Sequence, residues 1–247
     1  SGDIGDLSHD EFLQAVKDER VIEIWNDVFM EYEKKDGKVV GKLSQRNVDT
    51  GAGLERITAV MQGKKTAYDT DLFEGVMSVI NEKKGKTDAV SERVVADHVR
   101  TSVMMLADGV VPGNSDRNYI LRRLLRRAVR HADKLEIPEN NLGVIAGAVI
   151  EKYKEIYPNV FANMGVILSE IEKEENKFRE TLEHGMKEFE KGADAFILFS
   201  TYGFPLELTL EVAKEKGIKI DRNEFENKMK EHQALSRTAS AGMFKGG

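Results

Sequence analysis

The segment NVDTGAGLERI, residues 47–57, places an acid, two glycines and an arginine within eight positions. These residue types could form a binding site or an ordinary turn, because glycine adopts positive φ without steric cost. If the segment is only a turn, Asp49 and Thr50 cap the following helix and Arg56 lies on its solvent side. The eleven residues alone leave both interpretations open, so their neighbours must decide between them.

A second group of chemically active side chains is a run of arginines in YILRRLLRRAVRHA, without an interleaved acid. Helical spacing stacks three of them on one face and sets the other two beside it. Arginine makes planar, bidentate contacts with phosphate, which favours a polyanion as partner. The alternative is that acidic helices of the same domain, such as residues 170–191, neutralise the run. The five arginines are Arg122, Arg123, Arg126, Arg127 and Arg130.

Several chemistries are excluded by composition. The chain has no Cys, which removes disulfides, thiolate metal sites and Cys nucleophiles. His98 has only the adjacent Asp97 nearby at ligand spacing, so we interpret it as a structural histidine and expect no zinc site. No Walker-type phosphate loop and no Ser-His-Asp arrangement is visible. No apolar run approaches the ~20 residues that span a bilayer, and we expect a cytoplasmic protein that does not bind membranes.

The elements that must position these residues begin with a strand over residues 21–35, rich in β-branched and aromatic side chains. Asp36-Gly37 predicts the turn of a hairpin, and the returning strand leads into residues 47–57. A helix then follows and stops at Gly63. The period of two in the first strand places five side chains on one face: Ile22, Ile24, Asn26, Val28 and Met30.

The rest of the chain is predicted to be almost wholly helical. Ser8 is expected to cap a short helix before the first strand, Ser91 to cap a helix that Gly109 stops, and Gly203-Phe204-Pro205 to form a corner between helices. The predicted fold class is α+β, mostly α, with an α+β part over residues 1–80 and a helical domain over residues 81–247. Further helices are expected over residues 119–135, 141–153, 163–191, 206–216 and 221 to about 235.

Nine segments, taken in order from about residue 20 onward, closely resemble the alanine–tRNA ligase (alanyl-tRNA synthetase) family of class II aminoacyl-tRNA synthetases. The resemblance implies that residues 1–80 form the C-terminal part of the antiparallel sheet of the aminoacylation domain, including motif 3. It implies that residues 81–247 form the helical tRNA-recognition domain. The segments are EIWNDVFMEY, VDTGAGLERI, YDTDLF, RVVADHVRT, ADGVVPGN, YILRRLLRRAVRHA, KFRETLEHG, YGFPLELT and MFKGG.

By this resemblance, residues 47–57 are motif 3, which disfavours the interpretation that they form only a turn. Arg56 is expected to contact the phosphates of ATP, which enters as a substrate with Mg²⁺, and to be the catalytic group. A fixed guanidinium stabilises the multiply negative transition state of carboxylate adenylation without a proton transfer. Gly51 and Gly53 are expected to let the nucleotide approach bare backbone.

The resemblance also implies a site for L-alanine on the sheet. Asp49 is expected to accept the α-ammonium group of alanine, and Asn26 and Val28, which share one strand face, to line the pocket together with Gly51. A pocket of this size cannot cleanly reject glycine or serine, because a methyl or hydroxyl difference contributes only ~1–3 kcal/mol. The family adds a separate editing domain for this reason, and we find no such domain in this sequence.

The helical domain is expected to contact the acceptor stem of tRNA(Ala). Asn114, in the PGN loop, resembles the Asn with which the family reads a G·U pair through the wide minor groove of A-form RNA. Arg122, Arg126 and Arg130 are expected to contact phosphates, or in part the catalytic domain. Glu207 stands where many members carry an Asp, which adds a methylene and keeps an acceptor.

Motifs 1 and 2 of the family have no match in this sequence, and motif 2 supplies a second arginine that contacts ATP. We therefore expect the chain alone to be inactive, as part of a ligase. The alternative is a free-standing tRNA- or RNA-binding module derived from the synthetase.

Overall fold

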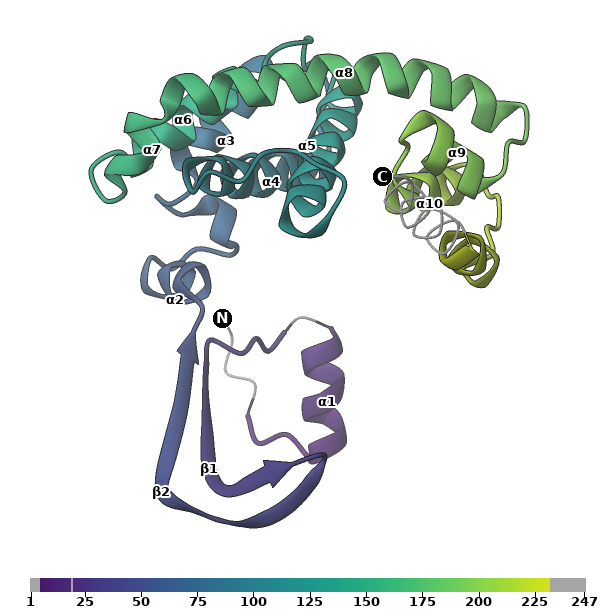
Figure 1. Ribbon diagram of the computed structural model, residues 1–247. Helices are drawn as coiled ribbons and strands as arrows, with labels where there is room; N and C mark the ends of the chain where they lie inside the picture. The colour runs from purple at the N-terminus through teal and green to yellow at the C-terminus, as the bar shows by residue number, and fades with distance from the viewer. Residues whose placement is uncertain (1–4, 19, 232–247) are drawn as a thin grey trace, which may run out of the picture. The chain divides into compact units, whose positions relative to one another are not determined.

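The computed structural model describes residues 5–18 and 20–231 (Figure 1). The chain divides into two compact units, Ser1–Glu74 and Gly75–Gly247. The sequence places the division near residue 80, inside α3 (Glu74–Lys83).

The first unit contains α1 (His9–Lys17) and a two-stranded antiparallel hairpin of β1 (Trp25–Lys35) and β2 (Lys38–Ala52). Ser8 caps α1, because its hydroxyl accepts from the Glu11 N–H while the Glu11 carboxylate accepts from the Ser8 N–H. The hairpin turn has positive φ at both central residues, 47° at Asp36 and 80° at Gly37, as the twist of the strands favours. The predicted cap and turn are both confirmed.

The hairpin leads into a short helical part. β2 ends at Ala52, and α2 (Leu54–Met61) begins after Gly53 and ends before Gly63, which has a φ of 61°. A 3₁₀ turn, η1 (Ala67–Asp69), follows. The predicted strand-to-helix transition is confirmed, whereas β1 begins at Trp25 rather than at residue 21.

The second unit is helical, as predicted. The longest helix of the described residues, α8 (drawn in green in Figure 1), contacts α4, α5 and α6 and continues to α9. Val99, Leu125, Ile145 and Ile171 are fully or almost fully buried in the core of this bundle. The helices are α3 (Glu74–Lys83), α4 (Ala89–Ala107), α5 (Asp116–Lys134), α6 (Leu142–Tyr153), α7 (Pro158–Ala162), α8 (Met164–Glu190), α9 (Ala195–Tyr202) and α10 (Leu206–Glu215), followed by a helical segment over residues 222–231.

Two details of the helical unit differ from the sequence prediction. The cap of α4 is Asp88, whose carboxylate accepts from the Val90 N–H, and the predicted cap Ser91 lies within the helix. The prediction of Ser91 is wrong because an Asp three residues earlier offers the same acceptor with a charge that favours a helix N-terminus. The helix α9 was not predicted; it ends at Gly203, which has a φ of 65°.

The fold class, α+β and mostly α, is confirmed. Residues 232–235 of the last predicted helix, and the closing segment MFKGG, lie outside the described residues.

Candidate functional site

The four residues expected to bind alanine lie together on one face of the hairpin. The strand register pairs Asn26 with Gly51 and Val28 with Asp49. Directly opposed residues of an antiparallel pair project to the same face, and positions two apart share that face. All four positions are exposed. The structure thus brings two segments, more than twenty positions apart in the chain, into one accessible surface.

Gly53 and Arg56 lie where this hairpin ends. The Gly53 N–H donates to the Ile24 carbonyl at 3.3 Å, and Nη1 of Arg56 donates to the Glu23 carbonyl at 2.7 Å. A Cβ at position 53 would lie only 3.3 Å from Cδ of Arg56. The absence of a side chain at Gly53 therefore lets the arginine stem lie against the backbone, while the guanidinium remains exposed.

The helix-capping role that the turn-only interpretation gave to Asp49 and Thr50 is wrong. Gly53 is the N-cap of α2 and has no side-chain capping bond. Thr50 lies on the other face of the hairpin, where its Oγ1 accepts from Nε1 of Trp25 at 2.7 Å. Asp27, the strand partner of Thr50, also lies near this indole, with 3.2 Å between Oδ1 and Nε1. The two faces therefore differ: on one face the Trp25 indole donates across the strands, whereas on the face of the predicted alanine site Nδ2 of Asn26 donates to Oε2 of Glu23 at 3.4 Å.

Arg126 lies inside the helical unit, and only 4% of it is exposed. Its Nε donates to Oε1 of Glu174 at 2.6 Å, and its Nη1 donates to the Gly203 carbonyl. The guanidinium also lies over the ring of Phe178, 5.1 Å from the centroid. Burial and these three contacts hold the guanidinium of Arg126 inside the helical unit.

Other arginines of α5 likewise pair with acids of the same unit. Nε of Arg127 lies 2.7 Å from Oε1 of Glu211, and Nη2 of Arg130 lies 2.9 Å from Oε2 of Glu215. Lys134 pairs with Glu215 as well. This is the arrangement of the alternative interpretation, in which acidic helices neutralise the cluster, although two of the three acids lie in α10 rather than in α8.

Glu211 shows how strongly these pairs stabilise the ionised carboxylate. Burial would raise the pKa of Glu211, but the nearby His131, whose Nε2 lies 3.6 Å from Oε2, and the charge and hydrogen bond of Arg127 outweigh it and lower the pKa to about 2. The sequence alone does not predict the partners Glu174, Glu211 and Glu215. Their only signal was the surplus of acid in the later helices, since each partner lies 48 to 85 positions from its arginine.

Asn114 and Arg122 meet at the loop that precedes α5. Nη1 of Arg122 donates to Oδ1 of the exposed Asn114, and Nε of Arg122 lies 3.7 Å from Oε1 of Glu174. The loop is closed by the Gly113 N–H, which donates to the Asn118 carbonyl at 3.0 Å. The backbone of Glu207 lies in α10, and its side chain lies outside the described part of the structure.

His98 has the contacts of a structural histidine. Its Nε2 lies 3.2 Å from Nη1 of Arg127, and its Nδ1 lies 3.2 Å from Oδ2 of Asp97. Arginine can only donate, so Nε2 accepts and the proton lies on Nδ1, facing the carboxylate. Within residues 5–18 and 20–231, no three His, Asp or Glu side chains form a group that could hold a metal ion.

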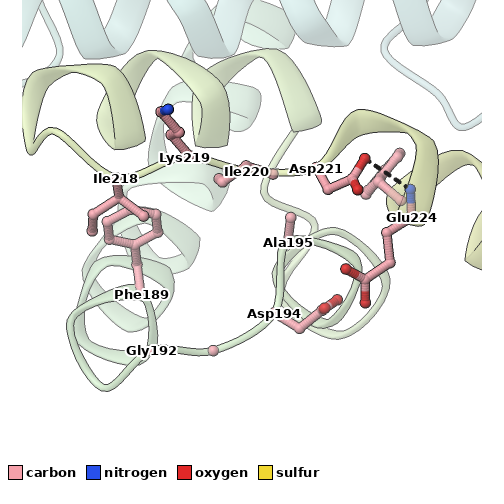
Figure 2. A pocket seen from close by; sticks show the side chains of 11 residues that line it. Phe189, Gly192, Asp194, Ala195, Ile218, Lys219, Ile220, Asp221 and Glu224 are labelled. Atoms are coloured by element: carbon pink, nitrogen blue, oxygen red, sulfur yellow. Dashed lines mark hydrogen bonds between the residues drawn. The ribbon is translucent and has the colours of Figure 1, made fainter.

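A separate pocket of about 240 Å³ lies between the end of α8, the start of α9 and residues 218–225 (Figure 2). Phe189 and Ile218 lie on its apolar side. Its acids have structural uses: Asp194 caps α9 through the Phe196 N–H, and Asp221 accepts from the Asn223 and Glu224 N–H groups. No predicted site residue lines this pocket.

No helix among the described residues has both the length and the apolar character that crossing a membrane would require.

The family model and the most similar proteins that were found agree on one family. The model of the class II tRNA synthetases (A) matches residues 4–245. An alanine–tRNA ligase of Thermotoga sp. strain RQ2 is 44% identical over 93% of this chain and 28% of its own length. The corresponding enzyme of Thermotoga maritima is 45% identical over 89% of the chain and 27% of its length, and that of Treponema pallidum is 40% identical over 92% and 41%. The chain thus spans less than half the length of these relatives, and it belongs to the class II tRNA synthetases (A) family.

Proposed function

We propose that the chain supplies part of an alanine–tRNA ligase, which activates alanine with ATP and transfers it to the 3′ end of tRNA(Ala). The observation that carries this proposal is the shared strand face of Asn26, Val28, Asp49 and Gly51, next to the exposed guanidinium of Arg56. The likeness to alanine–tRNA ligases over most of the chain supports it. The proposed reaction takes place in the cytoplasm, where aminoacyl-tRNA is used.

The proposed alanine site uses the side chains of that face. The carboxylate of Asp49 accepts a charge-assisted hydrogen bond from the α-ammonium group of alanine. Val28 contacts the methyl group, and Asn26 borders the pocket from the same strand. Gly51 lies opposite Asn26 and has no side chain to fill the space between the strands. A larger substrate side chain would lose these contacts.

The proposed ATP site lies at the end of β2. Arg56 contacts the phosphates, and its contact with the Glu23 carbonyl holds the guanidinium in place before ATP binds. A donor that is already positioned costs no reorganisation when negative charge develops in the transition state. Gly53 keeps the space beside the arginine stem open. The proposed substrate is ATP with Mg²⁺, an ion that prefers phosphate oxygens and water as ligands.

The proposed tRNA contact lies at the loop over residues 113–118. Asn114 reads the acceptor stem, and Arg122, which donates to Asn114, supports it and approaches a phosphate. Arg130 and Glu207 are further proposed contacts. The internal pairs of Arg126 lead us to assign its main role to the fold rather than to RNA.

The activation step is tested in a chimaera in which the chain replaces the matching segment of the Thermotoga maritima relative. Alanine-dependent exchange of pyrophosphate into ATP should be retained. Arg56→Ala should lower the exchange rate roughly 10²–10³-fold, as expected for a donor to a developing charge. The matched control is Arg46→Ala on β2, since the Arg46 side chain is 81% exposed and pairs only with Glu31 in the described contacts. A folded chimaera without exchange, or an Arg56→Ala variant with the full rate, would contradict the proposal.

The tRNA contact is tested by filter binding of the chain at two salt concentrations, with acceptor stems that carry G·U or G·C. Arg122→Glu should weaken binding to both stems and flatten the salt dependence, because fewer counterions are released, and it should also narrow the discrimination between the stems, because Asn114 loses its donor. Asn114→Ala should narrow the discrimination between the stems and leave the salt dependence unchanged. Equal losses on both stems would mean that Asn114 only positions the backbone. Binding of tRNA without any pyrophosphate exchange in the chimaera would instead favour a free-standing RNA-binding module.

A further inference from the structure

The two places proposed to contact the acceptor stem lie far apart in the sequence, but one series of side-chain contacts joins them. Asn114 lies in the loop before α5, and the backbone of Glu207 lies in the first turn of α10. The residue at the centre of the series is Glu174, in α8. The contacts run in order from Asn114 through Arg122, Glu174 and Arg126 to the Gly203 carbonyl, at the corner that leads into α10.

Glu174 is a buried carboxylate that faces two guanidiniums of α5. It is 5% exposed, and its Oε1 accepts from Nε of Arg126 at 2.6 Å and lies 3.7 Å from Nε of Arg122. The two arginines are four positions apart and therefore lie on the same face of α5. A buried carboxylate requires a charged partner, and Arg126 already provides one. The second guanidinium thus adds a link beyond the pair that burial requires.

Arg122 extends this link to the surface of the helical unit. Its side chain is 17% exposed, and its Nη1 donates to Oδ1 of Asn114, which is exposed. Because arginine can only donate, the amide of Asn114 turns its oxygen toward Arg122. Asn114 can then offer its two Nδ2–H donors to a ligand. Arg122 therefore determines which polar group of Asn114 faces a partner.

Arg126 extends the same link to the corner before α10. Its Nη1 donates to the Gly203 carbonyl, and a Cβ at Gly203 would lie 3.2 Å from this nitrogen. The next residue, Phe204, is fully buried, and its ring centroid lies 6.4 Å from that of Phe178 in α8. Arg126 and α8 together thus hold the corner from which α10 begins.

We propose that Glu174 is a positioning residue for recognition of the acceptor stem. Its charge holds Arg122, which orients Asn114, and Arg126, which holds the start of α10. The loop over residues 113–118 and the first turn of α10 thereby keep a fixed relative position. Groups that read a base edge must be held to within about 0.5 Å, and the residues behind them supply this precision. This inference rests on the proposed tRNA contact.

The first test is the preference of the 247-residue chain for a G·U over a G·C acceptor stem, measured by filter binding at a temperature at which circular dichroism shows each variant folded. Glu174→Gln keeps the size of the side chain and removes its charge. It should lower the ratio of the two affinities about threefold or more, in the lower range of couplings between contacting groups. The matched control is Glu175→Gln, because the neighbouring Glu175 is 1% exposed and pairs with Arg179. The control should lower stability and leave the ratio unchanged, since a loss of stability alone affects both stems alike.

Two further variants test whether Glu174 acts through Asn114. In an Asn114→Ala background, Glu174→Gln should have a smaller effect on the ratio than in the unmodified chain, and full additivity would contradict the inference. Arg122→Lys keeps the charge but loses the planar fork that reaches both Glu174 and Asn114. It should narrow the ratio and leave the salt dependence unchanged. Arg127→Lys makes the same change at an arginine that pairs with Glu211, and it should leave the ratio unchanged.

The side-chain amide of Asn114 gives a readout that requires no RNA. In spectra of the ¹⁵N-labelled chain, Glu174→Gln should shift the Nδ2–H signals of Asn114, and Glu175→Gln should not. Unshifted signals, or an unchanged ratio of affinities, in Glu174→Gln would overturn the inference and leave the proposed tRNA contact intact. Failure of the unmodified chain to distinguish the two stems would instead contradict the proposed tRNA contact, and this inference with it, even where the signals shift as expected.

Discussion

The hairpin and the arginine-rich helix α5 both carry residues predicted to bind a substrate, but the side chains of these two regions have different surroundings in the structure. On the hairpin, the face of Asn26 and Asp49 is exposed and available to a ligand. On α5, Arg126 is buried, and it and Arg127 bind acids of their own unit. The comparison teaches that exposure and partners, rather than residue type alone, separate a candidate ligand site from a structural ion-pair network.

The largest effect expected from this difference concerns Arg126. Arg126→Ala should lower the free energy of unfolding of the helical unit by about 3–5 kcal/mol, because the buried Glu174 would lose its 2.6 Å partner and keep only Arg122, at 3.7 Å. Glu174 is only 5% exposed. Urea unfolding followed by circular dichroism measures the change. Arg117→Ala, at an exposed position of the same helix, is the control and should change stability by no more than about 0.5 kcal/mol. A similarly small loss of unfolding free energy in both variants would contradict the structural role of Arg126.

A second prediction concerns how the stability contributed by Glu211, a partner of the α5 arginines, depends on pH. The pKa of Glu211 is lowered from 4.5 to about 2 in the folded protein. The stability that the ionised Glu211 contributes is therefore present above about pH 4.5 and is lost as the pH falls toward 2, on the order of 3 kcal/mol. Glu211→Gln should lower stability at neutral pH and make the acid dependence between these limits shallower. Unfolding curves at a series of pH values check this, and parallel pH profiles would contradict it.

A smaller effect is expected where α8 meets the chain after α9. A Cβ at Gly185 would lie 2.7 Å from Cδ2 of Phe204, which is fully buried. Gly185→Ala should therefore destabilise the protein by about 1–3 kcal/mol, although alanine is the better helix former. Gly147→Ala, inside α6 with nothing within 4 Å, should instead stabilise by about 0.4–1 kcal/mol. Thermal unfolding shows whether each substitution lowers or raises the stability. A Gly185→Ala variant as stable as the unmodified chain would show that Phe204 can move.

These differences explain what could be predicted from the sequence. The residues opposite Asn26 and Val28 did not follow from the turn, because the register shifts between Glu33 and Lys34 and again between Met30 and Tyr32. The shared face of Asn26 and Val28 followed from the strand period, and the turn itself from Asp36-Gly37. Both signals are local, so they survive without knowledge of the tertiary structure.

The partners of the arginines could not be predicted in the same way. Arg126 pairs with Glu174 and Arg127 with Glu211, and these contacts depend on how α8 and α10 pack against α5. The surplus of acid in the sequence indicated that neutralisation was possible, but not which acid meets which arginine.

The most direct test of the account compares the two faces of the hairpin in the same chimaera. The Michaelis constant for alanine in pyrophosphate exchange is measured for Asp49→Asn and for Asp27→Asn, which make the same change on opposite faces of the hairpin. We predict that Asp49→Asn raises this constant about tenfold or more, since it removes a charge-assisted hydrogen bond of ~1.5–3 kcal/mol. Asp27→Asn should leave it nearly unchanged, because Asp27 contacts the Trp25 indole. Equal effects of the two variants, or an unchanged constant in Asp49→Asn, would contradict the assignment of the alanine site to this face.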